Sequence, residues 1–184
     1  MRKIIAIIGD SKLEKNSDKY NLAKKLGKLL VDNGYRVISG GMDGVMSAAF
    51  EGAKSSIKAS DSDTIAIIPS FNPHDANEFS DIIIPTGLDL YRNGIVANSD
   101  AVIAIGGGSG TLSEISHAWA LYRLVIAFDN VEGWSSKLAG TKIDNRKRYE
   151  DIDDKVYSVK SPEEVIDLLT ELLELYIRRH KRIV

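Results

Sequence analysis

The residues best suited to chemistry form a glycine-rich run near the middle of the chain. Four glycines fall within the five positions Gly106–Gly110, directly after the apolar stretch Ala101–Ile105. Glycine lets a backbone approach a ligand closely, and the first turn of a helix offers unpaired N–H groups at its positive dipole end. A strand, a glycine turn and a helix in succession therefore indicate a phosphate site. The residues expected to bind the phosphate are Gly107, Gly108, Ser109, Gly110 and Thr111.

This run differs from two common nucleotide motifs. No Gly-Lys-Ser/Thr follows the glycines, so the run is not a P-loop, and hydrolysis of nucleoside triphosphates is not expected. The dinucleotide fingerprint also fits poorly, because the turn follows a late strand and no acidic residue closes the following strand, Leu124–Phe128, until Asp129. A simpler alternative for Thr111 is that its side chain only caps the helix.

Alternating strand and helix patterns must position this turn. Short apolar runs predict strands at Ile4–Ile8, Val37–Ile38, Ile65–Ile68, Asp81–Ile84, Ala101–Ile105, Leu124–Phe128 and, at an edge, Val156–Val159. Helical spacing predicts helices over Asp18–Asp32, Val45–Ala53, Asp89–Ser99, Thr111–Tyr122 and Pro162–Arg178. The alternation predicts an α/β, Rossmann-like fold, with a mainly parallel sheet covered by helices on both faces. At 184 residues we expect one domain, residues 1–184.

Composition narrows the range of partners. The 24 Lys and Arg residues face 26 Asp and Glu residues, and this balance gives no basic excess for binding nucleic acid. The chain has no cysteine, which excludes thiol nucleophiles, and its three histidines are scattered, so no metal site is expected. The apolar run Ile4–Ile8 is too short for a signal peptide or a membrane span. We expect a cytoplasmic protein that does not contact membranes.

The run Gly107–Glu114 resembles the P-G-G-x-G-T-x-x-E motif of LOG-like proteins, a family long named for lysine decarboxylation. The resemblance extends over about residues 3–128. It includes Ser39–Met46, which is similar to the family's first glycine turn and brings in Gly41, and Ser11, which matches a position facing the nucleotide. Active members of the family are phosphoribohydrolases, which cleave the N-glycosidic bond of cytokinin or purine nucleoside 5′-monophosphates without an organic cofactor.

By the same resemblance, Glu114 and Arg92 match the family's catalytic pair. Cleavage of an N-glycosidic bond builds oxocarbenium character on the ribose, which a carboxylate can stabilise, while an arginine can hold the phosphate or assist the leaving base. Two structural alternatives stay open at this point. Glu114 could form a capping box with Thr111, and Arg92 could be a surface side chain.

Two departures from the motif point to another branch of the family. Gly106 replaces the motif's proline, and Asn93 stands where hydrolytic members carry lysine. Both resemble the branch of molybdenum-cofactor carrier proteins. Three hypotheses follow: a phosphoribohydrolase acting on a substrate such as AMP, a carrier or sensor of a phosphorylated pterin or nucleotide, and a structural homo-oligomer. A homodimer or larger oligomer is expected, with an interface on the helix face of Ile115, Trp119 and Leu121.

Overall fold

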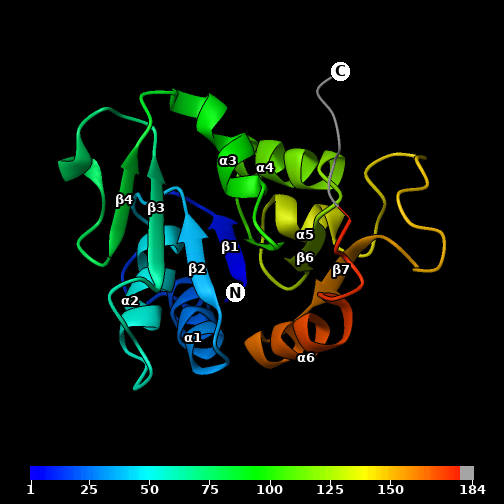
Figure 1. Cartoon of the computed structure of the whole chain (residues 1–184), viewed down its shortest axis with the longest axis horizontal. Coiled ribbons are helices and arrows are strands. Elements are labelled where there is room, and N and C mark those ends of the chain that lie inside the picture. The colour runs from blue at the N-terminus through cyan, green and yellow to red at the C-terminus, as the bar shows by residue number, and fades with distance from the viewer. Residues whose placement is uncertain (179–184) are drawn as a thin grey trace.

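The computed structural model describes residues 1–178. These residues form a parallel sheet between two layers of helices (Figure 1). The sheet has seven strands in the order β4-β3-β2-β1-β5-β6-β7, and every neighbouring pair is parallel. The strands are β1 (Ile4–Gly9), β2 (Arg36–Ser39), β3 (Thr64–Ile68), β4 (Ile82–Pro85), β5 (Ala101–Ile105), β6 (Leu124–Phe128) and β7 (Val156–Val159). This confirms the predicted Rossmann-like α/β fold, with β7 as an edge strand.

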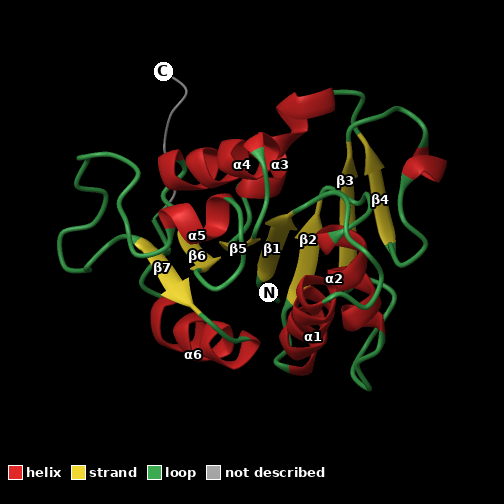
Figure 2. Cartoon of the chain, turned by 180° about the vertical axis from the view of Figure 1, so that it is seen from behind, coloured by secondary structure: helices red, strands yellow, loops and turns green. Residues whose placement is uncertain are grey.

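Helices pack on both faces of the sheet because its central strands are apolar on both sides. One core cluster joins the sheet to α1 (Asp18–Asp32), α2 (Val45–Lys54) and α6 (Pro162–Leu172). A second cluster joins the other face to α3 (Asn93–Ala97), α4 (Ser109–Ala120) and α5 (Trp134–Leu138), as Figure 2 shows from behind. All residues of β5 and β6 are buried, as expected for parallel strands covered on both faces.

Two predicted helices are shorter than their patterns indicated. In place of a helix over Asp89–Ser99, the chain forms the 3₁₀ turn η2 (Asp89–Arg92) and then α3. Asp89 begins η2 with a φ of 50°, which a continuous helix does not allow. The last helix ends at Leu172 rather than Arg178, because Tyr176 turns into the core, where its hydroxyl donates to Asp154 at 2.7 Å.

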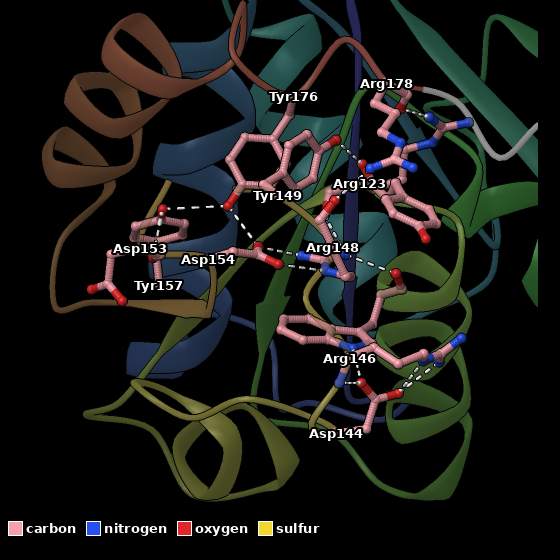
Figure 3. A network of polar contacts seen from close by, with 12 residues as sticks. Arg123, Asp144, Arg146, Arg148, Tyr149, Asp153, Asp154, Tyr157, Tyr176 and Arg178 are labelled. Atoms are coloured by element: carbon pink, nitrogen blue, oxygen red, sulfur yellow. Dashed lines mark hydrogen bonds and ion pairs between the residues drawn. The ribbon is translucent and has the colours of Figure 1, made fainter. Parts of the chain in front are cut away.

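Buried Arg148 fastens the irregular segment between α5 and β7 to the end of α4 (Figure 3). Its guanidinium donates from Nε and Nη2 to the two carboxylate oxygens of Asp154, at 2.7 and 2.5 Å. Nη1 donates to the carbonyl oxygens of Trp119 (2.7 Å) and Arg123 (3.2 Å), and the guanidinium carbon lies 3.6 Å from the centre of the Trp119 ring. A cation at the carboxyl end of α4 complements the helix dipole, so this cluster stabilises the helix that begins at the glycine turn.

The predicted oligomer interface on α4 is wrong. Ile115 and Trp119 are 0% and 1% exposed within the chain itself, and Trp119 stacks on Arg148. Large apolar side chains are instead exposed along edge strand β4 and on η2 and α3: Ile82, Ile83, Ile84, Leu88, Leu90, Tyr91 and Ile95. Among residues 1–178, no helix combines the length and apolar character that a membrane span needs.

Candidate functional site

The strand order of the sheet fixes where the glycine turn lies. The chain reverses direction across the sheet between β1 and β5, and ligands of open α/β sheets bind at the carboxyl ends of the strands at such a switch point. Gly9 of β1 pairs in register with Ile105 of β5. The turn after β1 and the glycine-rich turn after β5 therefore leave the sheet side by side.

A cleft of about 400 Å³ opens at this position. Its walls come from the ends of three adjacent strands β2, β1 and β5, together with η2 and the first turns of α2 and α4. The lining residues are Ile8, Gly9, Asp10, Ser11, Gly40, Met46, Leu90, Arg92, Asn93, Gly108, Ser109, Gly110, Thr111 and Glu114. The volume lies in the usual range for small-molecule sites.

Two glycines of the turn are required by the fold. Gly106 and Gly107 have φ angles of 63° and 91°, which side chains rarely adopt. A Cβ at Gly106 would lie 2.4 Å from Oδ2 of Asp10, and one at Gly107 would lie 2.1 Å from Oγ1 of Thr111. The turn is also hydrogen-bonded to the start of α5, since the backbone N–H groups of Trp134 and Ser135 donate to the Gly107 and Gly106 carbonyl oxygens at 2.9 and 3.0 Å.

The other two glycines have no such structural reason. Gly108 has an extended backbone with φ −99°, and Gly110 lies in the first turn of α4, which begins at Ser109. Apart from their own chain neighbours and, for Gly110, the backbone of its own helix, no atom of the described residues lies within 4 Å of a Cβ built at either position. Gly108 is the N-cap residue and has no side chain to cap α4, so the first N–H groups of the helix remain available to a ligand. Glycine at 108 and 110 keeps that approach open.

Arg92 and Glu114 form an ion pair inside the cleft. Nη1 of Arg92 lies 2.9 Å from Oε1 of Glu114, and the side chains are only 12% and 9% exposed. The surface position considered for Arg92 is thus wrong. The capping box considered for Glu114 is wrong as well, because α4 begins at Ser109 and its cap is Gly108, which places Thr111 and Glu114 inside the helix.

Burial has the largest effect on the pKa of the Glu114 carboxyl. Removal from water raises the pKa of the Glu114 carboxyl to about 7, although the neighbouring Arg92 charge and hydrogen bond act to lower it. The carboxyl therefore exchanges its proton near neutral pH. Such perturbed carboxyl groups in a cleft are typical of functional sites, although structural ion pairs also produce them.

Gly40 and Asn93 hold Arg92 in place. A Cβ at Gly40 would lie 2.2 Å from Nη2 of Arg92, so the guanidinium packs directly on the backbone after β2. The buried Asn93 side chain accepts a hydrogen bond from Nη1 of Arg92 at 2.8 Å. A lysine at position 93 would put a second buried positive charge beside Arg92. Asn93 in place of the motif's lysine therefore fits the buried position beside Arg92. Glycine in place of the motif's proline fits position 106, because proline cannot adopt a φ of 63°.

Most of the residues expected in the site meet in this cleft. Ser11, Arg92, Glu114 and the segment Gly108–Thr111 all line it. Gly107 lies behind the wall, against Thr111. Gly41 is also outside the lining: its φ is 69°, a Cβ there would collide with Ala66 and Ile68 of β3, and its carbonyl accepts hydrogen bonds from Asn77.

Sequence reasoning missed the role of Gly40 and of an ion pair beside the cleft. Asp10, which lines the cleft, pairs with Lys19 of α1 at 2.6 Å. Lys19 also donates to the carbonyl oxygen of Glu132 at 3.1 Å. The position of Asp10 directly after a buried strand was a usable signal, whereas its partner depends on the packing of α1.

Comparison with known proteins agrees with this geometry. A family model described as the SLOG cluster4 family matches residues 2–166. The chain belongs to this family. The match confirms the LOG-like resemblance of the glycine-rich motif.

Solved structures of similar proteins share the whole fold. The X-ray structure of TM1055 superposes with a TM-score of 0.80 at 26% identity, covering 92% of this chain and 99% of that one. The molybdenum cofactor binding protein from Rippkaea orientalis gives a TM-score of 0.73 at 32% identity, over 94% and 98% of the two chains. The molybdenum cofactor carrier protein from Chlamydomonas reinhardtii gives 0.74 at 26% identity, over 94% and 99%. Among its structural relatives, this SLOG cluster4 protein thus resembles proteins described as binding molybdenum cofactor.

Proposed function

We propose that the protein binds a small phosphorylated heterocycle, of the molybdenum-cofactor pterin or nucleotide type, and holds it as a carrier or sensor. The observation that carries this proposal is the open start of α4. Gly108 and Gly110 leave the first N–H groups of the helix accessible at the switch point of the sheet, where a phosphate is stabilised by hydrogen bonds and the helix dipole. The likeness to two proteins described as binding or carrying molybdenum cofactor supports the same ligand class.

The residues of the cleft suit the phosphate end of such a ligand. Ser109 and Thr111 add hydroxyl groups beside the N–H groups of α4, and Ser11, which follows β1, lines the same cleft. Nε of Arg92 is buried and, within residues 1–178, has no hydrogen-bond partner. The chain has no cysteine that could bind molybdenum through a thiolate, so recognition would rest on the organic and phosphate parts of the ligand.

One observation favours a second candidate, hydrolysis of a nucleoside 5′-monophosphate. The Glu114 carboxyl, with a pKa of about 7, lines the same cleft as the phosphate-binding turn. A carboxylate near the anomeric carbon could stabilise an oxocarbenium-like transition state, and Arg92 could orient the phosphate or the leaving base.

One set of assays separates the two candidates. The purified protein is mixed with molybdenum cofactor released from a molybdoenzyme, and co-elution of the pterin is measured by gel filtration. In parallel, AMP and other nucleoside monophosphates are incubated with the protein, and free base and ribose 5-phosphate are quantified. Binding without release supports the carrier, whereas release that disappears in Glu114→Gln supports the hydrolase. Absence of binding for every phosphorylated compound contradicts both and favours a purely structural protein.

The expectation of a homo-oligomer is kept as part of this proposal, with a changed surface. The apolar residues exposed along β4 and η2 offer an edge that a second copy would cover. Leu90 belongs both to this surface and to the lining of the cleft. Light scattering of the wild type and of Ile83→Lys tests the proposal, which expects a smaller species in the variant.

A further inference from the structure

A second cavity of about 520 Å³ adjoins the phosphate cleft. The two cavities share Ser11 in their linings. Between them, the backbone of Gly44 packs so closely on the end of β1 that a Cβ there would lie 2.1 Å from the carbonyl oxygen of Asp10. This contact closes the space beneath Ser11, so the two cavities adjoin at the exposed Ser11, over which a ligand with its phosphate on α4 would extend into the second space.

The inner part of the second cavity offers apolar surface and hydroxyl groups. Leu13 and Phe79 are both half-buried and line it. Tyr20 and Ser47 line it as well, and the Tyr20 hydroxyl donates to Glu51. Burial, together with that carboxylate, raises the pKa of Tyr20 to about 12, so the phenol stays protonated at all physiological pH values. These surroundings suit a flat, uncharged ring with polar edges.

The rim of the cavity disfavours a second phosphate. Three exposed carboxylates line it, from Glu14, Asp43 and Glu78, against the two lysines Lys12 and Lys15. The α4 end of the first cleft attracts an anion, whereas this rim carries more negative than positive charge. The charge difference orients a ligand that has phosphate at one end and a neutral ring at the other.

Asn77 fixes the two segments that carry Asp43 and Glu78. Its side-chain Nδ2 donates to the carbonyl oxygens of Gly41 and Met42, both at 3.0 Å, and its backbone N–H donates to Gly41 at 2.8 Å. The residues next to these anchors, Asp43 on one segment and Glu78 on the other, are thereby held at the same cavity.

We infer that the second cavity receives the heterocyclic ring of the ligand and selects amino-oxo rings, the class of guanine and pterins. In such rings an N–H group and an amino group stand side by side, and the two oxygens of one carboxylate can accept both hydrogen bonds. Adenine presents a ring nitrogen acceptor beside its amino group, which would face a carboxylate unfavourably. The inference rests on the proposed function, because it requires phosphate binding at α4.

Titration calorimetry with GMP, AMP and ribose 5-phosphate tests this inference. We expect wild-type protein to bind GMP about tenfold more tightly than AMP, and AMP no more weakly than ribose 5-phosphate. The one of Glu78→Gln and Asp43→Asn that removes the accepting carboxylate should lower GMP affinity about tenfold, and the double variant should show the same loss. Neither variant should change the affinity for ribose 5-phosphate. Asp75→Asn is the matched control, because Asp75 lies on the same loop as Glu78 but outside the lining of this cavity.

A third variant tests the cavity without removing charge. Ser47→Leu adds volume at the inner wall, and it should weaken GMP binding while ribose 5-phosphate binding persists. The inference is overturned if GMP and AMP bind equally, or if all three variants leave GMP affinity unchanged. Binding of ribose 5-phosphate without preference for GMP overturns only this inference. Failure of all three compounds to bind the wild type overturns the proposed function as well.

Discussion

Gly110→Ala should stabilise the protein and weaken its binding of phosphate at the same time. Gly110 lies in the first turn of α4, and outside its chain neighbours and the backbone of α4 itself a Cβ there would meet no described atom within 4 Å. Alanine in place of glycine in a helix adds about 0.5–1 kcal/mol to the free energy of unfolding. For a chain of this size, that corresponds to a rise in Tm of roughly 1–4 °C.

The expected effect on binding has the opposite sign. The methyl group would project into the space that a phosphate must enter to reach the N–H groups of α4. Loss of one or two hydrogen bonds to a charged group removes about 1.5–3 kcal/mol each, which corresponds to a decrease in affinity of at least roughly tenfold. Thermal unfolding and titration with inorganic phosphate and AMP measure both quantities on the same samples.

A matched control is available on the neighbouring helix. Gly94 lies in α3 outside the lining of the cleft, and a Cβ there would lie 3.8 Å from the His117 ring, an ordinary contact distance. Gly94→Ala should therefore raise Tm without changing affinity. If Gly110→Ala binds phosphate and AMP as tightly as the wild type, the phosphate does not lie at the start of α4 and the reasoning fails.

Three further predictions concern the surroundings of the cleft. Burial raises the pKa of Glu114 from 4.5 to about 7, so the protonated Glu114 carboxyl stabilises the folded protein below pH 4.5, and this stabilisation, on the order of 3 kcal/mol, is lost as pH rises through 7. Urea unfolding between pH 5 and 8 should show this decrease in the free energy of unfolding. An equal decrease in Glu114→Gln would contradict the assignment of the pH effect to Glu114. Gly106→Pro should prevent folding or lower Tm strongly, since proline cannot adopt φ 63°, whereas normal circular dichroism and Tm would show that the turn can rearrange. Asp154→Ala leaves the buried Arg148 charge without its carboxylate and should cost about 3–5 kcal/mol, a decrease in Tm of roughly 10 °C; a change below 2 °C would show that Arg148 finds another partner.

Local patterns sufficed for most elements of the fold. Each predicted strand overlaps an observed one, because short apolar runs such as Ile65–Ile68 are stable when buried in a parallel sheet; among the described strands, only edge strand β4 keeps its apolar side chains exposed. The two helices that differ from the prediction were altered at single residues. Tyr176 leaves the helical path to reach Asp154, and the backbone of Asp89, the first residue of η2, has a positive φ.

The site could be predicted in part, for a similar reason. The four glycines that follow a strand were enough to predict Gly108–Thr111 as part of the site, since this signal depends only on residues adjacent in sequence. The distinction between Gly40 and Gly41 could not be made in the same way. Both glycines follow β2, and only the positions of Arg92 and of β3 determine which one faces the cleft.

The sequence by itself determined the fold class, the position of the glycine-rich turn and the family, because strand–turn–helix periodicity and the glycine motif are local properties. Tertiary structure alone decided that Nη1 of Arg92 and Oε1 of Glu114 lie 2.9 Å apart, since the two residues are 22 positions apart in sequence and lie on different elements, η2 and α4. It also decided that Trp119 lies in the core against Arg148 instead of at an interface. Contacts between distant segments depend on how whole helices pack on the sheet, and no single stretch of residues specifies that packing.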